Sequence, residues 1–254
     1  DSDILVRNAA IYNAGKKKIK LKKAYSFCLD IQGGEYDILR LGGRWAQERN
    51  PKKTPLSHGI IRLQSLRGCS SHQTNPFIGI LKRGCGEAIG NCIGVQLIYS
   101  GSFSITCEQR DEVPIRVQGG VCDVNFSWEL SAGETFETPQ AALCYSSKGL
   151  GGLSRAYADF IREHIINPNW VYKRRPIVIN NWEATYFDFN EEKLFQIIDA
   201  AAKIGVDTFV LDDGWFGKRD NDYSGLGDWY VNEKKLKGGL KTIIDRCKQR
   251  GLKF

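Results

Sequence analysis

The feature that most constrains this chain is an apolar run that ends abruptly in two carboxylates. Residues 206–211 lead directly into Asp212, Asp213, a glycine and a tryptophan. Such a run is typical of a buried parallel strand that reaches the surface at its carboxyl end. Ligands of α/β folds lie at that end of the strands. The stretch therefore predicts a ligand site at the edge of a parallel sheet.

The residues around this stretch alternate between strand and helix patterns. Residues 177–182 predict a first strand, and an apolar face at helical spacing follows in 190–205, with Asn190 as its N-cap. A third helical face occupies 240–251, and 252–254 read as the start of another strand. The order β-α-β-α-β predicts the opening of a parallel barrel or of a doubly wound sheet. An eight-stranded barrel takes about 250 residues, so the sheet cannot close within this chain.

The first half of the chain predicts a different class of domain. From residue 4 to about 146, short alternating or apolar runs are separated by glycine, asparagine and proline, which indicates an all-β sandwich. Strands are predicted at 18–25, 36–41, 59–63, 77–81, 94–99, 103–107, 115–118 and 126–130. A flexible glycine-rich stretch at 149–153 and a helix at 154–165 follow. We therefore expect a β-sandwich portion at 1–147, a linker helix at 148–175 and the start of an α/β domain at 176–254.

Composition narrows the classes of partner. The net charge is +7, and much of the excess lies in a lysine-rich stretch at 16–23. Because these lysines alternate with apolar residues and no aromatic residue interleaves to stack bases, we expect a solvated strand face and no nucleic-acid partner. No apolar run is long enough to span a membrane, so no membrane partner is expected. The eight cysteines form no Cys-x-x-Cys motif, which argues against zinc, and buried free thiols explain most of them.

The chain has no methionine, even at position 1, and its last residues resemble a strand just starting. We therefore expect it to be a piece of a longer protein. The first residues show no basic region followed by an apolar core, so no signal peptide is visible and a cytoplasmic protein is favoured.

Adjacent carboxylates suit binding better than bond cleavage. Consecutive residues at a strand end point in divergent directions, so Asp212 and Asp213 are poor candidates for the facing acid and nucleophile of a glycosidase. They are good acceptors for two neighbouring hydroxyls of one sugar, and Trp182 on the neighbouring strand end could give a stacking face. A magnesium site and a solvated acidic pair remain open alternatives. No cofactor is expected, because no G-x-G-x-x-G leads from a strand to a helix. Four further carboxylates of the same rim are each predicted to be structural: Glu183, Asp220, Asp222 and Asp228.

Trp45 is unusual in the first half because it stands among charged residues. It could be a platform for a sugar ring, or it could pack beneath a loop.

Several motifs carry a resemblance to a known family. The stretches 180–189, 211–219 and 226–229 lie in the second half, and 41–46, 67–72, 75–77 and 99–101 lie in the first. On these residues the chain resembles the α-galactosidases of glycoside hydrolase family 36, along essentially its whole length. The sandwich departs from the family pattern at Leu66, Gln47 and 118–122. That family has an N-terminal β-sandwich, a catalytic (β/α)8 barrel and a C-terminal β-domain. The resemblance implies that this chain is an internal portion, with the sandwich followed by the first βα units of an incomplete barrel.

The resemblance also implies roles for particular residues. Asp212 and Asp213 hold galactose hydroxyls, Trp182 lines the same pocket, and Trp45 reaches a substrate pocket, which could belong to a neighbouring subunit. The nucleophile and the acid/base are aspartates of later strands, expected beyond Phe254, so this chain has no catalytic residue, no metal and no cofactor, and is expected to be inactive alone.

For the full-length protein the resemblance implies retaining hydrolysis of terminal α-galactosides of the melibiose or raffinose type, and a homo-oligomer. The alternatives are a galactosyltransferase of the raffinose-synthase type, an α-N-acetylgalactosaminidase, a non-catalytic galactose-binding module, and a metal-dependent α/β enzyme.

Overall fold

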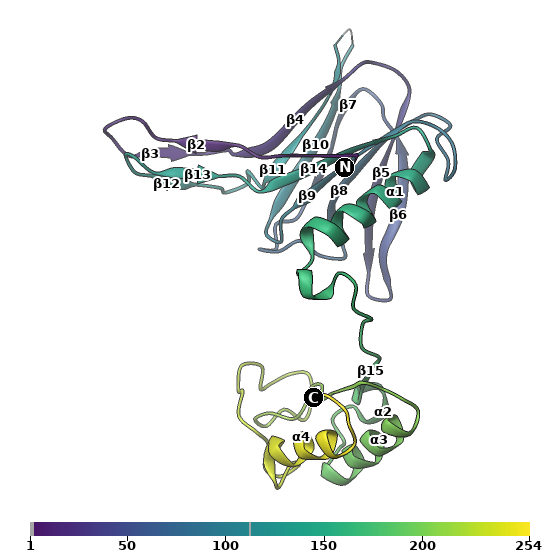
Figure 1. The fold of residues 1–254 in the computed structure, drawn as a ribbon. Coiled ribbons are helices and arrows are strands. Elements are labelled where there is room, and N and C mark those ends of the chain that lie inside the picture. The colour runs from purple at the N-terminus through teal and green to yellow at the C-terminus, as the bar shows by residue number, and fades with distance from the viewer. Residues whose placement is uncertain (1–2, 112) are drawn as a thin grey trace. The chain divides into compact units, whose positions relative to one another are not determined.

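The computed structural model describes residues 3–111 and 113–254, and the chain divides into two compact units (Figure 1). The first unit is Asp1–Ile166 and the second is Asn167–Phe254. Within the described residues, no helix combines the length and the apolar composition that crossing a membrane requires.

The first unit is built on two antiparallel sheets that share one apolar core. The larger sheet has, in spatial order, β1 (Ile4–Arg7), β14 (Gln140–Ser146), β9 (Cys92–Ile98), β8 (Thr74–Lys82), β5 (Tyr36–Arg44) and β6 (Gln47–Pro55). The smaller sheet has β4 (Tyr25–Ile31), β11 (Ile115–Val121), β10 (Phe103–Gln109) and β7 (Gly59–Gln64). Alternate residues of both sheets, such as Ile78 and Phe103, are fully buried between them. The predicted all-β architecture of this half is confirmed.

A narrow ribbon of short strands extends away from these sheets (Figure 1). In it β2 (Ala10–Tyr12) pairs with β13 (Thr135–Glu137), and β3 (Ile19–Leu21) pairs with β12 (Trp128–Leu130). The lysines of 16–23 lie here and are all exposed, as the alternation predicted, and Lys18 pairs with Glu129 at 2.9 Å. The strand predicted at 18–25 is interrupted, since β3 ends at Leu21 and β4 begins at Tyr25.

The first helix, α1 (Gly149–Phe160), begins five residues before the predicted start, in the glycine-rich stretch expected to be flexible. The glycines allow close packing instead. A Cβ at Gly149 would lie 2.6 Å from the Gly86 carbonyl oxygen. The helix packs on the outer face of the larger sheet through Leu153, Tyr157 and Phe160, and the Tyr157 hydroxyl donates to the Ala142 carbonyl at 2.9 Å. A π-helical turn at Ile161–Ile165 and a 3-10 turn at Pro168–Trp170 follow.

The second unit begins with two parallel strands, β15 (Val178–Asn180) and β16 (Thr208–Val210). Between and after them lie the helices α2 (Trp182–Thr185), α3 (Glu191–Lys203) and α4 (Gly239–Gln249). The side chain of Asn190 accepts from the Lys193 N–H at 3.0 Å, which confirms the predicted N-cap. The apolar faces of α3 and α4 meet Phe209 in a closed core. Lys253 forms a parallel bridge with Thr208, so the chain returns to the sheet where a third strand was predicted.

One acidic residue joins the two long helices of this unit. Asp199 of α3 accepts from Arg246 of α4 at 2.8 Å and from Arg250, just after α4, at 2.9 Å. The hydrogen bonds from Arg250 and Arg246 lower the pKa of Asp199 to about 2. The two arginines therefore favour the ionised form of Asp199 in the folded protein.

We predict that Asp199→Asn destabilises the protein at neutral pH and that the difference disappears in acid. A carboxyl whose folded pKa is depressed contributes stability above its unfolded pKa of about 3.9, and that contribution is lost as the pH falls towards 2. Melting temperatures of the complete protein between pH 7 and pH 2.5 measure this. Asp245→Asn, which removes an exposed pair with Lys241 on α4, is the control and should have little effect at any pH. An Asp199→Asn difference that stayed constant down to pH 2.5 would contradict the assignment.

Candidate functional site

The candidate site lies where the two parallel strands end. Asn180 of β15 is in register with Val210 of β16, so the carboxyl ends of both strands meet at one edge. Trp182 follows the first strand, and Asp212 and Asp213 follow the second. The structure therefore brings three of the four predicted binding residues to one edge of the second unit.

Two asparagines tie the strand ends together. The Asn180 side chain accepts from the Trp182 N–H at 2.8 Å and donates to the Asp212 carboxylate. Asn181 is fully buried; its side-chain oxygen accepts from the Asp212 N–H at 2.8 Å, and its amide donates to Thr185 at 3.0 Å. Trp182 and Asp212 are thus held by the same short polar network.

The two carboxylates are oriented separately. Asp212 accepts from the Asp213 N–H at 2.7 Å, and Asp213 accepts from the Gly214 N–H at 2.7 Å. Gly214 has φ +86°, and a Cβ there would lie 2.9 Å from the Phe187 ring, so this turn requires glycine. The side chain of Asp212 pairs with Asn180, whereas that of Asp213 pairs with Arg219. The arrangement suits two acceptors for separate donors rather than a facing pair that shares one bond.

Arg219 is the buried partner of Asp213. Its side chain is only 6% exposed, and its Nε donates to Asp213 at 2.6 Å. Its Nη1 donates to the carbonyls of Asn221 at 3.0 Å and Ser224 at 2.7 Å, which folds the following loop around the guanidinium. The hydrogen bond from Arg219 lowers the pKa of Asp213, against the opposing effect of burial. Arg219 therefore favours the ionised form of Asp213 and orients its carboxylate.

Lys235 supports the same turn from the other side. Its ammonium donates to the Gly214 carbonyl at 3.1 Å, pairs with Asp220 at 2.8 Å, and lies 5.0 Å from the centre of the Phe189 ring. Other rim carboxylates also have local partners, since Asp222 lies 3.6 Å from Arg219 and Glu183 accepts from Tyr186. The structural roles expected for these carboxylates stay predictions.

The two predicted tryptophans have different settings. Trp182 is half-buried and meets the rings of Tyr186 and Phe187 at near-perpendicular angles, with centroids 5.3 and 4.9 Å away. Trp45 belongs to the first unit, in the turn between β5 and β6, and is 81% exposed. Trp45 therefore does not pack beneath a loop of the described chain.

The described parts of the chain contain no candidate metal site. Within residues 3–111 and 113–254, no group of three or more His, Cys, Asp and Glu side chains is placed to hold an ion. All eight cysteines carry free thiols, and six of them are buried.

Four residues of this site were absent from the predicted set: Asn180, Asn181, Arg219 and Lys235. The two asparagines could have been predicted from the sequence, because polar residues directly after an apolar strand indicate the end at which the strand reaches the surface. Arg219 ends the 211–219 stretch that carries the family resemblance, but neither its charge nor that of Lys235 indicates in the sequence that the side chain is enclosed.

The chain matches known families over nearly all of its length. Residues 1–131 match the glycosyl hydrolase family 36 N-terminal domain, and residues 135–254 match the melibiase family. The chain is 44% identical, over its whole length, to 27% of the bifunctional alpha-galactosidase/sucrose kinase AgaSK of Mediterraneibacter gnavus. It is 41% identical over 99% of its length to 35% of alpha-galactosidase AgaA of Geobacillus stearothermophilus.

Solved structures match equally well. The alpha-galactosidase AgaB of Geobacillus stearothermophilus superposes with a TM-score of 0.94 at 41% identity, over all of this chain and 35% of that one. The galactosidase domain of AgaSK gives a TM-score of 0.94 at 44% identity, over 99% of this chain and 35% of that one. The chain thus spans about a third of the length of the proteins it matches. With family matches over nearly every residue, this chain belongs to glycoside hydrolase family 36.

Proposed function

We propose that the complete protein hydrolyses terminal α-linked galactose from oligosaccharides of the melibiose and raffinose type, and that this chain supplies part of the galactose pocket. The observation that carries the proposal is the meeting of Trp182, Asp212 and Asp213 at one parallel strand edge. Relatives give the sugar: variants of the AgaA enzyme of Geobacillus stearothermophilus, 40% identical to this chain, were solved in complex with stachyose and with raffinose.

In this proposal the two carboxylates bind the sugar and take no part in cleaving the glycosidic bond. Asp212 and Asp213 accept hydrogen bonds from neighbouring hydroxyls of the galactose, and Trp182 lines the pocket. An ionised carboxylate forms stronger hydrogen bonds to hydroxyls than a neutral acid would, and the lowered pKa of Asp213 favours that form. The sugar is thereby oriented for residues that act on its anomeric carbon.

The bond-breaking residues belong to later strands in this proposal. The second unit forms the first βα units of a (β/α)8 barrel, with its domain beginning near residue 176, after a sandwich at 1–147 and a linker at 148–175. An aspartate attacks the anomeric carbon while a second carboxyl protonates the leaving oxygen, and water then releases galactose from the enzyme. Trp45, exposed on its hairpin, contributes to a substrate pocket of a neighbouring subunit in a homo-oligomer.

The first prediction from this proposal concerns Asp213. Replacing a carboxylate by an isosteric amide removes charge-assisted hydrogen bonds worth roughly 1.5–3 kcal/mol, which is about 10- to 100-fold in affinity. We expect Asp213→Asn and Asp212→Asn each to weaken galactose binding to the complete protein by that factor, measured by isothermal titration calorimetry. Asp188→Asn, an exposed carboxylate paired with Lys193, is the control and should bind galactose normally.

Two results would count against these assignments. If Asp213→Asn bound galactose with the affinity of the wild type, Asp213 would not be part of the galactose pocket. A galactose affinity that required added MgCl2 would favour the metal-dependent alternative.

The second prediction separates positioning by Arg219 from mere stability. Arg219→Gln removes the cation that lowers the pKa of Asp213, so the acid limb of galactose binding should move to higher pH. Arg219→Lys keeps the charge and should restore part of that shift, although it loses the planar fork. Titrations of the complete protein with galactose between pH 3 and pH 7, a range that extends below the ordinary pKa of an aspartate, measure both. If Arg219→Gln lowered the melting temperature but left the affinity and its pH dependence unchanged, Arg219 would be a structural residue only.

A further inference from the structure

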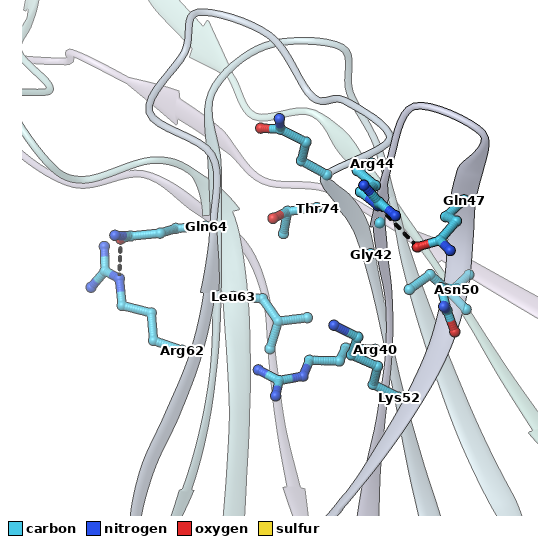
Figure 2. A pocket seen from close by; sticks show the side chains of 13 residues that line it. Arg40, Gly42, Arg44, Gln47, Asn50, Lys52, Arg62, Leu63, Gln64 and Thr74 are labelled. Atoms are coloured by element: carbon cyan, nitrogen blue, oxygen red, sulfur yellow. Dashed lines mark hydrogen bonds between the residues drawn. The ribbon is translucent and has the colours of Figure 1, made fainter.

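The first unit contains a cleft beside the hairpin of β5 and β6 that carries Trp45. It has a volume of about 520 Å³ and is formed by β5, β6, β7 and the start of β8 (Figure 2). The strands β6 and β7 are the outermost strands of their respective sheets, so the cleft opens where the sandwich ends. Its volume falls within the range of small-molecule sites, roughly 300–1,000 Å³.

The lining of this cleft is cationic. Arg40, Arg44, Lys52 and Arg62 line it, and no aspartate or glutamate does. Arg62 is neutralised by an ion pair with Asp123. The other three have no carboxylate partner within residues 3–111 and 113–254, and the only side-chain bond that Arg44 forms there is to the Gln47 oxygen at 3.1 Å. The cleft thus carries three positive charges that the described chain does not compensate.

Strand register forces two of these charges together. Arg40 of β5 is directly opposite Lys52 of β6, and Figure 2 shows both side chains extending from neighbouring strands into the same space. Like charges directly opposite each other destabilise an antiparallel pair. An anion between them would remove the repulsion and accept hydrogen bonds from both, and a guanidinium matches the geometry of a phosphate.

The neutral residues of the lining indicate what the anion is attached to. Gln73 and Asn50 offer amides and Thr74 offers a hydroxyl, while the apolar side chains of the lining are the half-buried Leu41 and the buried Leu63. Amides and hydroxyls suit a ligand that carries several hydroxyl groups. A phosphate ester of a sugar combines both requirements.

We propose that this cleft binds a sugar phosphate, with Arg40 and Lys52 holding the phosphate and the amide side chains contacting the sugar. The lining residues all belong to the first unit, whereas Asp212 and Asp213 belong to the second. A sugar phosphate and free inorganic phosphate would both place a phosphate group between Arg40 and Lys52, so the experiment must distinguish them.

Calorimetry on the complete protein at low ionic strength tests the proposal with three ligands: glucose 6-phosphate, inorganic phosphate and glucose. We expect glucose 6-phosphate to bind, glucose to fail, and the double variant Arg40→Gln/Lys52→Gln to bind the ester at least tenfold more weakly. The matched control Lys16→Gln/Lys17→Gln removes two exposed charges from the lysine-rich ribbon and should bind as the wild type does. Equal affinities for the ester and for inorganic phosphate would identify free phosphate as the ligand of the same anion site. No phosphate-dependent binding, or equal weakening by the control pair, would overturn the proposal.

Melting temperatures show whether the double variant is still folded, so that weaker binding is not mistaken for unfolding. Because the double variant removes a like-charge contact, its melting temperature without ligand should equal or exceed that of the wild type. Glucose 6-phosphate should raise the melting temperature of the wild type and leave that of the double variant unchanged. If neither phosphate compound bound and the double variant instead changed the oligomeric mass in sedimentation, the cations would serve a protein interface and the sugar-phosphate site would be refuted.

Discussion

The parallel pairing of β15 with β16 is the constraint on which the candidate site depends. Parallel strands end on the same side, and the register of Asn180 with Val210 makes both ends surface together. The chain then needs only short polar extensions to bring Trp182 and the two carboxylates to the same edge of the sheet. Asn180 and Asn181 make those extensions rigid, because each one bonds residues on both strand ends. A shift of register by one residue would turn these side chains to the opposite face of the sheet.

Buried cations behind the carboxylates complete this arrangement. A carboxylate at a partly enclosed strand end is disfavoured by desolvation unless a donor compensates. Arg219 supplies that donor and at the same time satisfies two loop carbonyls, so the fold of the loop and the charge of Asp213 depend on one side chain. The aromatic rings of Phe187 and Phe189 lie against Arg219 and Lys235, which helps to shield these cations from solvent. Binding geometry and loop structure are therefore coupled in this unit.

Sequence patterns predicted the parts of the fold whose burial is periodic. The apolar face of α3, its Asn190 cap and the strand before Asp212 were all found, because each follows from local spacing. The strand β6 was missed, since nearly all of its residues are exposed and it carries no apolar alternation; its pairing with β5 alone makes it a strand. The early start of α1 was missed for a related reason. Glycines 149 and 151 look like flexibility in a sequence, but here they let the helix approach the loop at 86–89 closely.

The same distinction between composition and register applies to charge. The lysines of 16–23 dominate the basic excess in the sequence, yet they point into solvent along a thin ribbon and lie near acidic residues such as Glu129. Arg40 and Lys52 are unremarkable in the sequence, separated by a hairpin that also contains Glu48. Only the antiparallel register of β5 with β6 places them opposite each other without an intervening carboxylate. Arg40 and Lys52 are exposed like the ribbon lysines, and a charge count cannot show that they lie opposite each other, because that depends on which strands pair and how. Like charges placed directly opposite each other disfavour the strand pairing, and an anion bound between them would offset that effect.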